Sequence, residues 1–266
     1  MTDFNFESEL WHQLVRNNEI GHDITDLQEI GSLIWHRGWS EANAGNVSFR
    51  LPASFTDYLA QIRDKFNTEM SNGVPENPLL YDWYLVSASG SRYREFKLRD
   101  FHNFVICGVD KELADDCIPG NIVVIPDDRK PTSEWQAHIA VQNMFLKSNR
   151  PERIVLHAHP TNWIVLSSMM KFIKEKQAVI NALHECLPEL KLYLPEGLSF
   201  LPYLAPGSNH LAEATLQAMT NSRALIWERH GVIVAGDSAA QAFDYLELVS
   251  KAADVYLELL KLNSLS

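Results

Sequence analysis

The stretch IVLHAHPTNW, residues 154–163, is the part of the sequence that most restricts the fold. An apolar run ends in two histidines separated by one alanine, and Pro160 then interrupts the strand. Because residues i and i+2 of a strand point to the same side, His157 and His159 project together. The stretch therefore predicts a strand whose end carries two imidazoles close enough to bind one metal ion, although a polar strand face would show the same pattern.

Helices and strands alternate on both sides of this stretch. Apolar side chains at helical spacing predict helices at 23–37, 131–148, 162–186, 208–219 and 238–262. Apolar runs predict strands near Val47, at 83–93 and at 120–128, and residues 223–237 predict two strands joined by a tight turn. The alternation indicates an α/β fold with a mostly antiparallel or mixed sheet. Residues 52–80 are polar and irregular, which predicts an insertion or a mobile segment.

The composition is that of a soluble globular protein. No run of about 18 apolar residues is present, so no membrane span is expected, and the acidic N-terminus does not resemble a signal peptide. The cysteines Cys107, Cys117 and Cys186 are too widely spaced for a disulfide framework, which favours the cytoplasm. A net charge of −11 argues against nucleic acid or an acidic membrane as a partner. It leaves a small phosphorylated substrate open, because backbone amides can hold one phosphate.

A catalytic metal site of the zinc type needs a third protein ligand. His230, in ERHGVIVAG, lies at the end of a predicted strand, and Gly231 lets the backbone pass close beside it. A hydrogen-bonded turn histidine is the alternative. The remaining histidines lie on predicted helices or polar loops without a comparable pairing, and they are His12, His22, His36, His102, His138, His184 and His210.

An acidic residue stands at the start of the helix predicted after Pro131. Glu134, in the motif PTSE, is either a helix-capping carboxylate or a general acid or base held beside a metal. Ser133, in the same turn, offers a hydroxyl and an amide to a phosphate. The full set of His-x-His, a distant His-Gly and this carboxylate favours the catalytic interpretation.

Five short motifs, in this order, resemble those of the class II aldolase/adducin family: NAGN (43–46), SGS (89–91), PTSE (131–134), HAHPTN (157–162) and RHG (229–231). The resemblance runs from about residue 23 to about residue 250. It implies a single α/β domain over 1–266 with a central, mostly antiparallel sheet flanked by helices. It also implies a C4 homotetramer with active sites at the subunit interfaces.

The resemblance assigns roles to individual residues. It implies one Zn2+ per subunit, held by His157, His159 and His230, with Glu134 as the catalytic carboxylate beside it. A second catalytic carboxylate, contributed by a neighbouring subunit, matches Glu189. The substrate phosphate would be held by loop residues that could otherwise be ordinary turn residues, and these are Asn43, Gly45, Asn46, Ser89, Gly90 and Ser133.

The activity implied is reversible aldol cleavage of a ketose 1-phosphate. The runs GWSEANAGNVSFR, PTSEWQAH and LPEGLSFLPYLAPGSNHLAEATLQAM are most similar to members that act on L-rhamnulose 1-phosphate and release L-lactaldehyde. Alternatives within the family are an L-fuculose-phosphate aldolase, a methylthioribulose-1-phosphate dehydratase and a sugar-phosphate 4-epimerase, although the epimerases carry aspartate in place of Glu134. An adducin-like binding domain is the non-enzymatic alternative, and such domains tend to lack the ligand histidines. The proton-donor tyrosine of fuculose-phosphate aldolases has no recognisable counterpart here.

Overall fold

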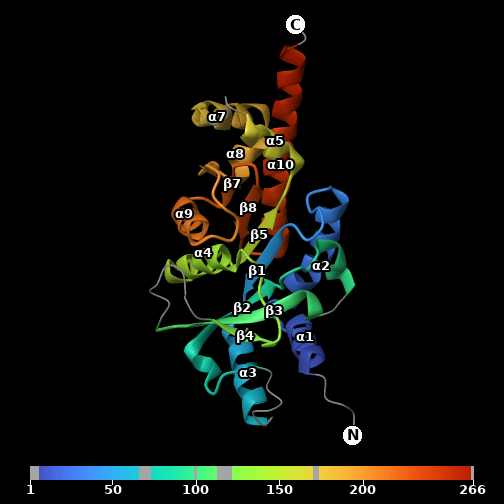
Figure 1. Ribbon diagram of the computed structural model, residues 1–266, viewed down its shortest axis with the longest axis vertical. Helices are drawn as coiled ribbons and strands as arrows, with labels where there is room; N and C mark the ends of the chain where they lie inside the picture. Colours follow the sequence, from blue (N-terminus) through green and yellow to red (C-terminus); the bar gives the residue numbers. More distant parts are fainter. Residues whose placement is uncertain (1–5, 66–72, 99–100, 113–121, 170–173, 265–266) are drawn as a thin grey trace.

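The described strands form one eight-stranded sheet. The computed structural model describes residues 6–65, 73–98, 101–112, 122–169 and 174–264 (Figure 1). The sheet order is β4-β3-β2-β1-β5-β8-β7-β6, and every pairing is antiparallel except the parallel pair β6–β7. The predicted mostly antiparallel sheet is therefore confirmed. The strands are β1 (Asn46–Arg50), β2 (Tyr81–Ser87), β3 (Phe104–Asp110), β4 (Val123–Ile125), β5 (Ile154–Ala158), β6 (Ser199–Leu201), β7 (Ala224–Trp227) and β8 (Gly231–Gly236).

Strand β5 lies in the middle of the sheet, between β1 and β8. His157 is paired with Asn46 of β1 on one side and with Ile233 of β8 on the other. All five residues of β5 are buried, as expected for a strand that is covered on both faces. Val155 packs in one core cluster and Leu156 in the opposite one, so His157 shares the face of Val155.

Helices cover both faces of the sheet (Figure 1). The face that bears Val155 packs against α4 (Trp135–Lys147) and α9 (Asn209–Met219). The other face packs in a larger cluster that includes side chains from α1 (Phe6–Arg16), α2 (Gly21–His36), α3 (Ala53–Lys65), α5 (Thr161–Ser168), α7 (Lys176–Cys186), α8 (Pro188–Tyr193) and α10 (Ala239–Asn263). Short 3-10 turns are η2 (Pro78–Leu80), η3 (Tyr93–Leu98) and η4 (Phe101–Asn103).

The closing helix α10 forms where its sequence predicts. Ser238 caps its start by accepting a hydrogen bond from the backbone N–H of Gln241. Ala242, Leu246 and Val249 repeat at helical spacing and are fully buried in the larger cluster. No helix in the described part of the chain is long and apolar enough to cross a membrane.

Three local expectations need correction. Ala53–Lys65 form α3, so the prediction of an irregular segment over 52–80 is wrong for these residues, while 66–72 lie outside the described residues. Strand β3 was not predicted from its run FVICGVD, which is buried almost throughout. The single helix predicted over 162–186 is wrong, because α5 ends at Ser168 and α7 begins at Lys176, with 170–173 outside the described residues.

Candidate active site

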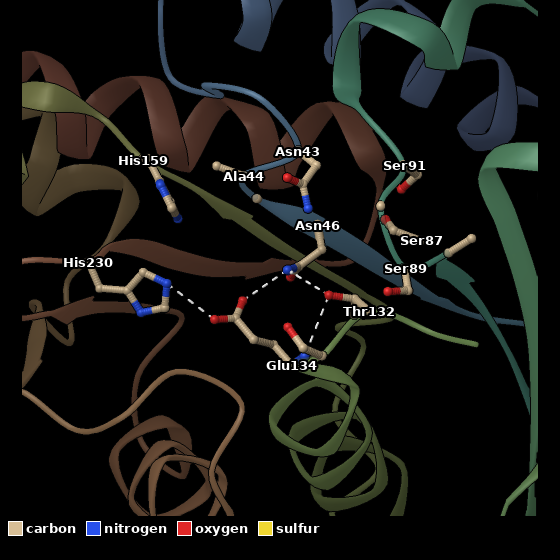
Figure 2. Close-up of a pocket in the computed structure, with 14 residues that line it drawn as sticks. Asn43, Ala44, Asn46, Ser87, Ser89, Ser91, Thr132, Glu134, His159 and His230 are labelled. Carbon is tan, nitrogen blue, oxygen red and sulfur yellow. Dashed lines mark hydrogen bonds and ion pairs between the residues drawn. The ribbon is translucent and has the colours of Figure 1, made fainter.

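A pocket of about 120 Å³ opens where the loop before β1, the end of β2 and the start of α4 meet (Figure 2). One end carries His159 and His230, the other end carries serine and threonine hydroxyls, and Glu134 and Asn46 lie between them. All predicted site residues line this pocket except His157, which is fully buried, and Glu189. The complete lining is Asn43, Ala44, Gly45, Asn46, Ser87, Ala88, Ser89, Gly90, Ser91, Thr132, Ser133, Glu134, His159 and His230.

The three predicted histidines come together at one end of the pocket. Each offers a ring nitrogen, and these nitrogens lie within 4.8 Å of one another. The Nε2 atoms of His157 and His159 are 3.1 Å apart. Among the described residues, this is the group of His, Cys, Asp and Glu side chains that could hold a metal ion. The fold therefore brings together the three histidines that the sequence analysis grouped, His157, His159 and His230.

The hydrogen bonds made by Nδ1 of His157 and of His159 determine whether the Nε2 atom of each ring is free to bind a metal ion. Nδ1 of His157 lies 2.9 Å from the carbonyl oxygen of Val232, which can only accept, so Nδ1 carries the proton and Nε2 keeps its lone pair. Nδ1 of His159 lies 2.8 Å from Oε1 of Glu41 in the same way. Burial lowers the pKa of His157 well below its usual value, which keeps the ring neutral. Two imidazoles whose Nδ1 atoms are engaged elsewhere and whose Nε2 atoms face each other fit a divalent cation with a preference for nitrogen ligands.

His230 is presented by the tight turn between β7 and β8. Its ring stacks on that of Trp227, with centroids 5.0 Å apart and an interplanar angle of 26°. A Cβ atom at Gly231 would lie 2.3 Å from the carbonyl oxygen of Ala158 and close to both other histidine rings, at 3.0 and 3.1 Å. Glycine after His230 is therefore required for the turn to approach β5, in agreement with the close passage predicted from the sequence.

Glu134 is held by the site rather than by the helix that follows it. Its side chain makes no capping hydrogen bond to α4, although the residue occupies the N-cap position. Oε2 accepts from Nδ2 of Asn46 at 2.9 Å, and Oε1 lies 3.2 Å from Nε2 of His230. Burial alone raises the pKa of Glu134, but His157, His230 and the Asn46 amide outweigh it and hold the pKa well below the usual range. The carboxylate is ionised at neutral pH and can act as a base.

The opposite end of the pocket is rich in neutral hydrogen-bond donors. Gly45 has φ +80°, and a Cβ atom there would lie 2.7 Å from both the His157 carbonyl oxygen and the Tyr93 ring, so only glycine lets this loop lie against β5. Among the residues that the structure describes, neither lysine nor arginine lines the pocket. Ser87, Ser91 and Thr132 line the pocket but were not singled out from the sequence, although Ser91 and Thr132 belong to the motifs SGS and PTSE.

Glu189 lies elsewhere in the same chain. It is on α8 and lines a different pocket, of about 460 Å³, together with residues such as Arg37, Tyr193 and Lys251. One chain by itself therefore does not bring Glu189 to the histidines. The role predicted for it, as a contribution from a neighbouring copy, stays a prediction.

An α/β fold with a histidine triad beside an ionised carboxylate defines a protein equipped for metal-assisted acid–base chemistry. The profile described as "Class II Aldolase and Adducin N-terminal domain" matches residues 25–257. The chain belongs to this family. Together with relatives that are named aldolases, the match identifies it as an enzyme of the lyase class.

Individual relatives are similar over most of their length. A rhamnulose-1-phosphate aldolase of Bacteroides thetaiotaomicron is 30% identical over 239 residues, which is 90% of this chain and 86% of that protein. One from Listeria welshimeri is 28% identical over 238 residues, 89% of this chain and 83% of that protein. The crystal structure of a sugar-phosphate aldolase from Thermotoga maritima superposes with a TM-score of 0.71 at 28% identity, covering 91% of this chain and 96% of that one.

More distant structures share the fold alone. The L-fuculose-1-phosphate aldolase of Thermus thermophilus is 15% identical, with a TM-score of 0.56 over 92% of this chain and 98% of that one. The predicted class II aldolase-like fold is confirmed by these likenesses together with the family match.

Proposed function

We propose that the chain catalyses the reversible aldol cleavage of L-rhamnulose 1-phosphate to dihydroxyacetone phosphate and L-lactaldehyde, with one Zn2+ per chain. The observation that carries the proposal is the pairing of two chemistries in one pocket. A histidine triad that could hold a metal ion stands at one end, neutral hydrogen-bond donors stand at the other, and the ionised Glu134 lies between them. The names of the B. thetaiotaomicron and L. welshimeri relatives support this choice of sugar phosphate.

The serine and threonine end suits the phosphate of the substrate. Ser89 and Ser133 supply hydroxyls there, and the loop of Asn43 and Gly45 supplies closely approaching backbone. Such nests of neutral donors bind phosphate without a cationic side chain. A substrate held there by its phosphate extends past Asn46 and Glu134 toward the histidines (Figure 2).

Glu134 is the group that moves the proton at carbon. In cleavage, the C3–C4 bond of the ketose breaks as the C4 hydroxyl loses its proton, and the electron pair stays on the three-carbon phosphate fragment. Glu134, which is ionised in the free site, takes up one proton from the solvent and delivers it to C3 of that fragment, and in the synthetic direction it removes the same proton and returns it to the solvent. His157, His159 and His230 would hold the metal, which when bound supplies Lewis acidity toward the negative charge that develops.

We propose a homotetramer in which Glu189 from a neighbouring copy handles the proton of the C4 hydroxyl. The chain is proposed to be one domain and to work in the cytoplasm, which fits its widely spaced cysteines and a reducing compartment.

The test is release of dihydroxyacetone phosphate from L-rhamnulose 1-phosphate, measured with and without EDTA. We expect release that stops with the chelator and returns with added Zn2+, and a lower kcat/KM with L-fuculose 1-phosphate in a parallel assay. A preparation that contains about one zinc per chain and releases no product from L-rhamnulose 1-phosphate would exclude this substrate.

A further inference from the structure

Behind Glu134, away from the pocket, runs a chain of buried polar side chains. His138 lies one helical turn after Glu134 on α4, is fully buried, and does not line the pocket. Its Nε2 lies 2.5 Å from Oδ1 of Asn46, and its Nδ1 lies 3.0 Å from Oγ of Ser48. Ser48 in turn accepts from Nε2 of Gln142 at 3.1 Å. Each member is at most 5% exposed, so bulk water does not compete for these bonds.

The hydrogen-bond donors determine which atom donates and which accepts at each step of this network. Asn46 directs Nδ2 at two acceptors, Oε2 of Glu134 at 2.9 Å and Oγ1 of Thr132 at 3.0 Å, and so it presents Oδ1 to His138. A carbonyl oxygen can only accept, so Nε2 of His138 must carry a proton. Burial lowers the pKa of His138 to about 4, which leaves the ring neutral with Nδ1 free to accept from the Ser48 hydroxyl.

The opposite orientation of the Asn46 side-chain amide is unfavourable. If the Asn46 amide were rotated by half a turn, its oxygen would face the Glu134 carboxylate, and two acceptors would oppose each other at hydrogen-bond distance. Its nitrogen would then face the Nε2–H of His138, so that two donors would meet there as well. The Glu134 carboxylate and the Nε2–H tautomer of His138, which the Ser48 hydroxyl supports at Nδ1, therefore favour the same orientation of the Asn46 amide.

We propose that His138 is a positioning residue for Glu134, which acts by locking the amide of Asn46 so that its N–H groups hold the catalytic carboxylate. The inference rests on the proposed function, because it assigns a purpose to the proton transfer at Glu134. His138 touches neither the pocket nor the three metal-binding histidines through any described hydrogen bond. Its effect therefore falls on turnover and not on metal affinity.

Two substitutions of His138 distinguish the contribution of its Nε2 atom from that of its Nδ1 atom. In general the amide nitrogen of glutamine can replace histidine Nε2, while the shorter asparagine reaches only as far as Nδ1. His138→Gln can still donate to Asn46, and His138→Asn can contact Ser48 but not Asn46. We expect kcat to fall about 10–100-fold in His138→Asn and to stay within about threefold of wild type in His138→Gln, the scale usual for outer-shell partners.

The matched control is Val141→Ala, which removes packing from the same helix without touching the network. It should lower the melting temperature and leave kcat unchanged, with KM, zinc per chain and melting temperature measured for every variant. Zinc content should stay near that of wild type in both His138 variants. Equal kcat in His138→Asn and His138→Gln, or a loss in His138→Asn that follows its zinc content, would overturn the proposal.

If both His138 variants fail to fold, Ser48→Ala tests the positioning role of His138 instead. This variant removes the hydroxyl donor to Nδ1, frees the His138 ring to exchange tautomers, and should lower kcat by about 3–10-fold. An unchanged kcat in Ser48→Ala would overturn the proposal.

The proposed function is judged separately, on the wild-type enzyme. Wild type is tested for release of dihydroxyacetone phosphate and for exchange of one carbon-bound hydrogen of that product with D2O. Absence of both activities in wild type refutes the proposed function, whereas a wild type active in either assay with indistinguishable His138 variants refutes only the role of His138.

Discussion

At the scale of single residues, His157 combines complete burial with two unlike neighbours on its two nitrogens. Nδ1 is satisfied by the Val232 carbonyl, and Nε2 faces His159 and lies 3.6 Å from Oε2 of Glu134. A buried ring that is neutral and directs a lone pair into a site is prepared to bind a metal without first losing a proton. The hydrogen bond to Val232 also fixes the ring orientation, so the ring would already be in place for a metal ion.

His157→Ala should therefore remove the metal together with the activity. We expect zinc per chain to fall from about one to well below half after dialysis, because a site with two remaining histidines binds zinc weakly. Elemental analysis of the purified protein measures this. His184→Ala, on α7 and outside the pocket, is the matched histidine control and should keep its zinc. Full zinc occupancy in His157→Ala would remove His157 from the metal ligands.

Residues that repeat a local pattern could be predicted, and residues that act through distant contacts could not. His157 and His159 are close because strand alternation places them so, and Glu134 is marked by its position at a helix start. His138 has no such mark. Its partners Asn46 and Ser48 are 92 and 90 residues away in the sequence and meet it only once β1 packs under α4. The same holds for Glu41, whose contact with His159 spans 118 residues.

At the scale of elements, the parallel pair β6–β7 depends on an ion pair. Arg223, just before β7, donates from Nε to Oε1 of Glu196 at 2.7 Å and from Nη2 to Oε2 at 2.9 Å. The guanidinium also lies over the ring of Tyr245 on α10. Burial raises the pKa of Glu196, but the Arg223 hydrogen bonds outweigh it, so the pKa in the folded protein is lowered. The bidentate contact therefore stabilises the ionised carboxylate of the folded state.

Glu196→Gln should destabilise the fold in a pH-dependent way. Because the folded pKa lies below the unfolded value of about 4.3, the stabilisation is complete above that pH and disappears as pH falls through the folded pKa. We expect the variant to lose about 1 kcal/mol of unfolding free energy at pH 7 and progressively less below about pH 4. Urea unfolding of wild type and variant at pH 7 and below about pH 4 measures the difference in unfolding free energy.

Glu258→Gln is the control for Glu196→Gln. Glu258 pairs with Lys261 on the exposed end of α10, where the two side chains are 66% and 68% exposed, and the pair contributes little. A Glu196 effect no larger than that of Glu258, or one that grows toward acid, would contradict the assignment.

The elements themselves were predictable where the sequence carries a long amphipathic stripe or an apolar run bounded by turn residues. The stripe of α10 and the buried runs of β1, β5 and β8 carry strong periodic or apolar signals. Helix α3 buries Phe55, Leu59 and Ile62 at helical spacing, but the polar residues between them hide this weak stripe. Strand β3 forms because β2 and β4 pair with it on both sides, which is a tertiary condition.

At the scale of the whole molecule, the position of Glu189 has a consequence for the assembly. Glu189 lines a pocket on α8, whereas Glu134 and the histidines belong to another pocket of the same chain. If both carboxylates serve one reaction, each active site joins two copies. The exposed apolar side chains Leu192 and Tyr193, on the same short helix as Glu189, suit a surface covered by another copy.

Mixed assemblies test this arrangement. Glu134→Gln should keep its zinc and lose about 10²–10⁴-fold in kcat, the scale of general acid–base catalysis, and Glu189→Gln should also be impaired. When the two variant proteins are unfolded and refolded together, some interfaces combine an intact Glu134 with an intact Glu189, so kcat should rise above either variant alone. Light scattering should give the mass of four chains. No recovery of kcat in refolded mixtures of that mass would exclude an active site that combines Glu134 of one copy with Glu189 of another.

The central register of the sheet links shape to chemistry. Asn46, His157 and Ile233 are aligned across β1, β5 and β8, and the hydroxyl of Tyr93 contacts the backbone carbonyl oxygens of both Asn46 and His157, at 2.6 and 2.9 Å. A slip of one residue would turn His157 to the opposite face, yet leave a compact chain rich in β-structure. If the histidine triad binds a metal ion as proposed, only a chain with the correct register gains the added stability of the bound ion, so metal binding would favour correctly aligned chains during folding.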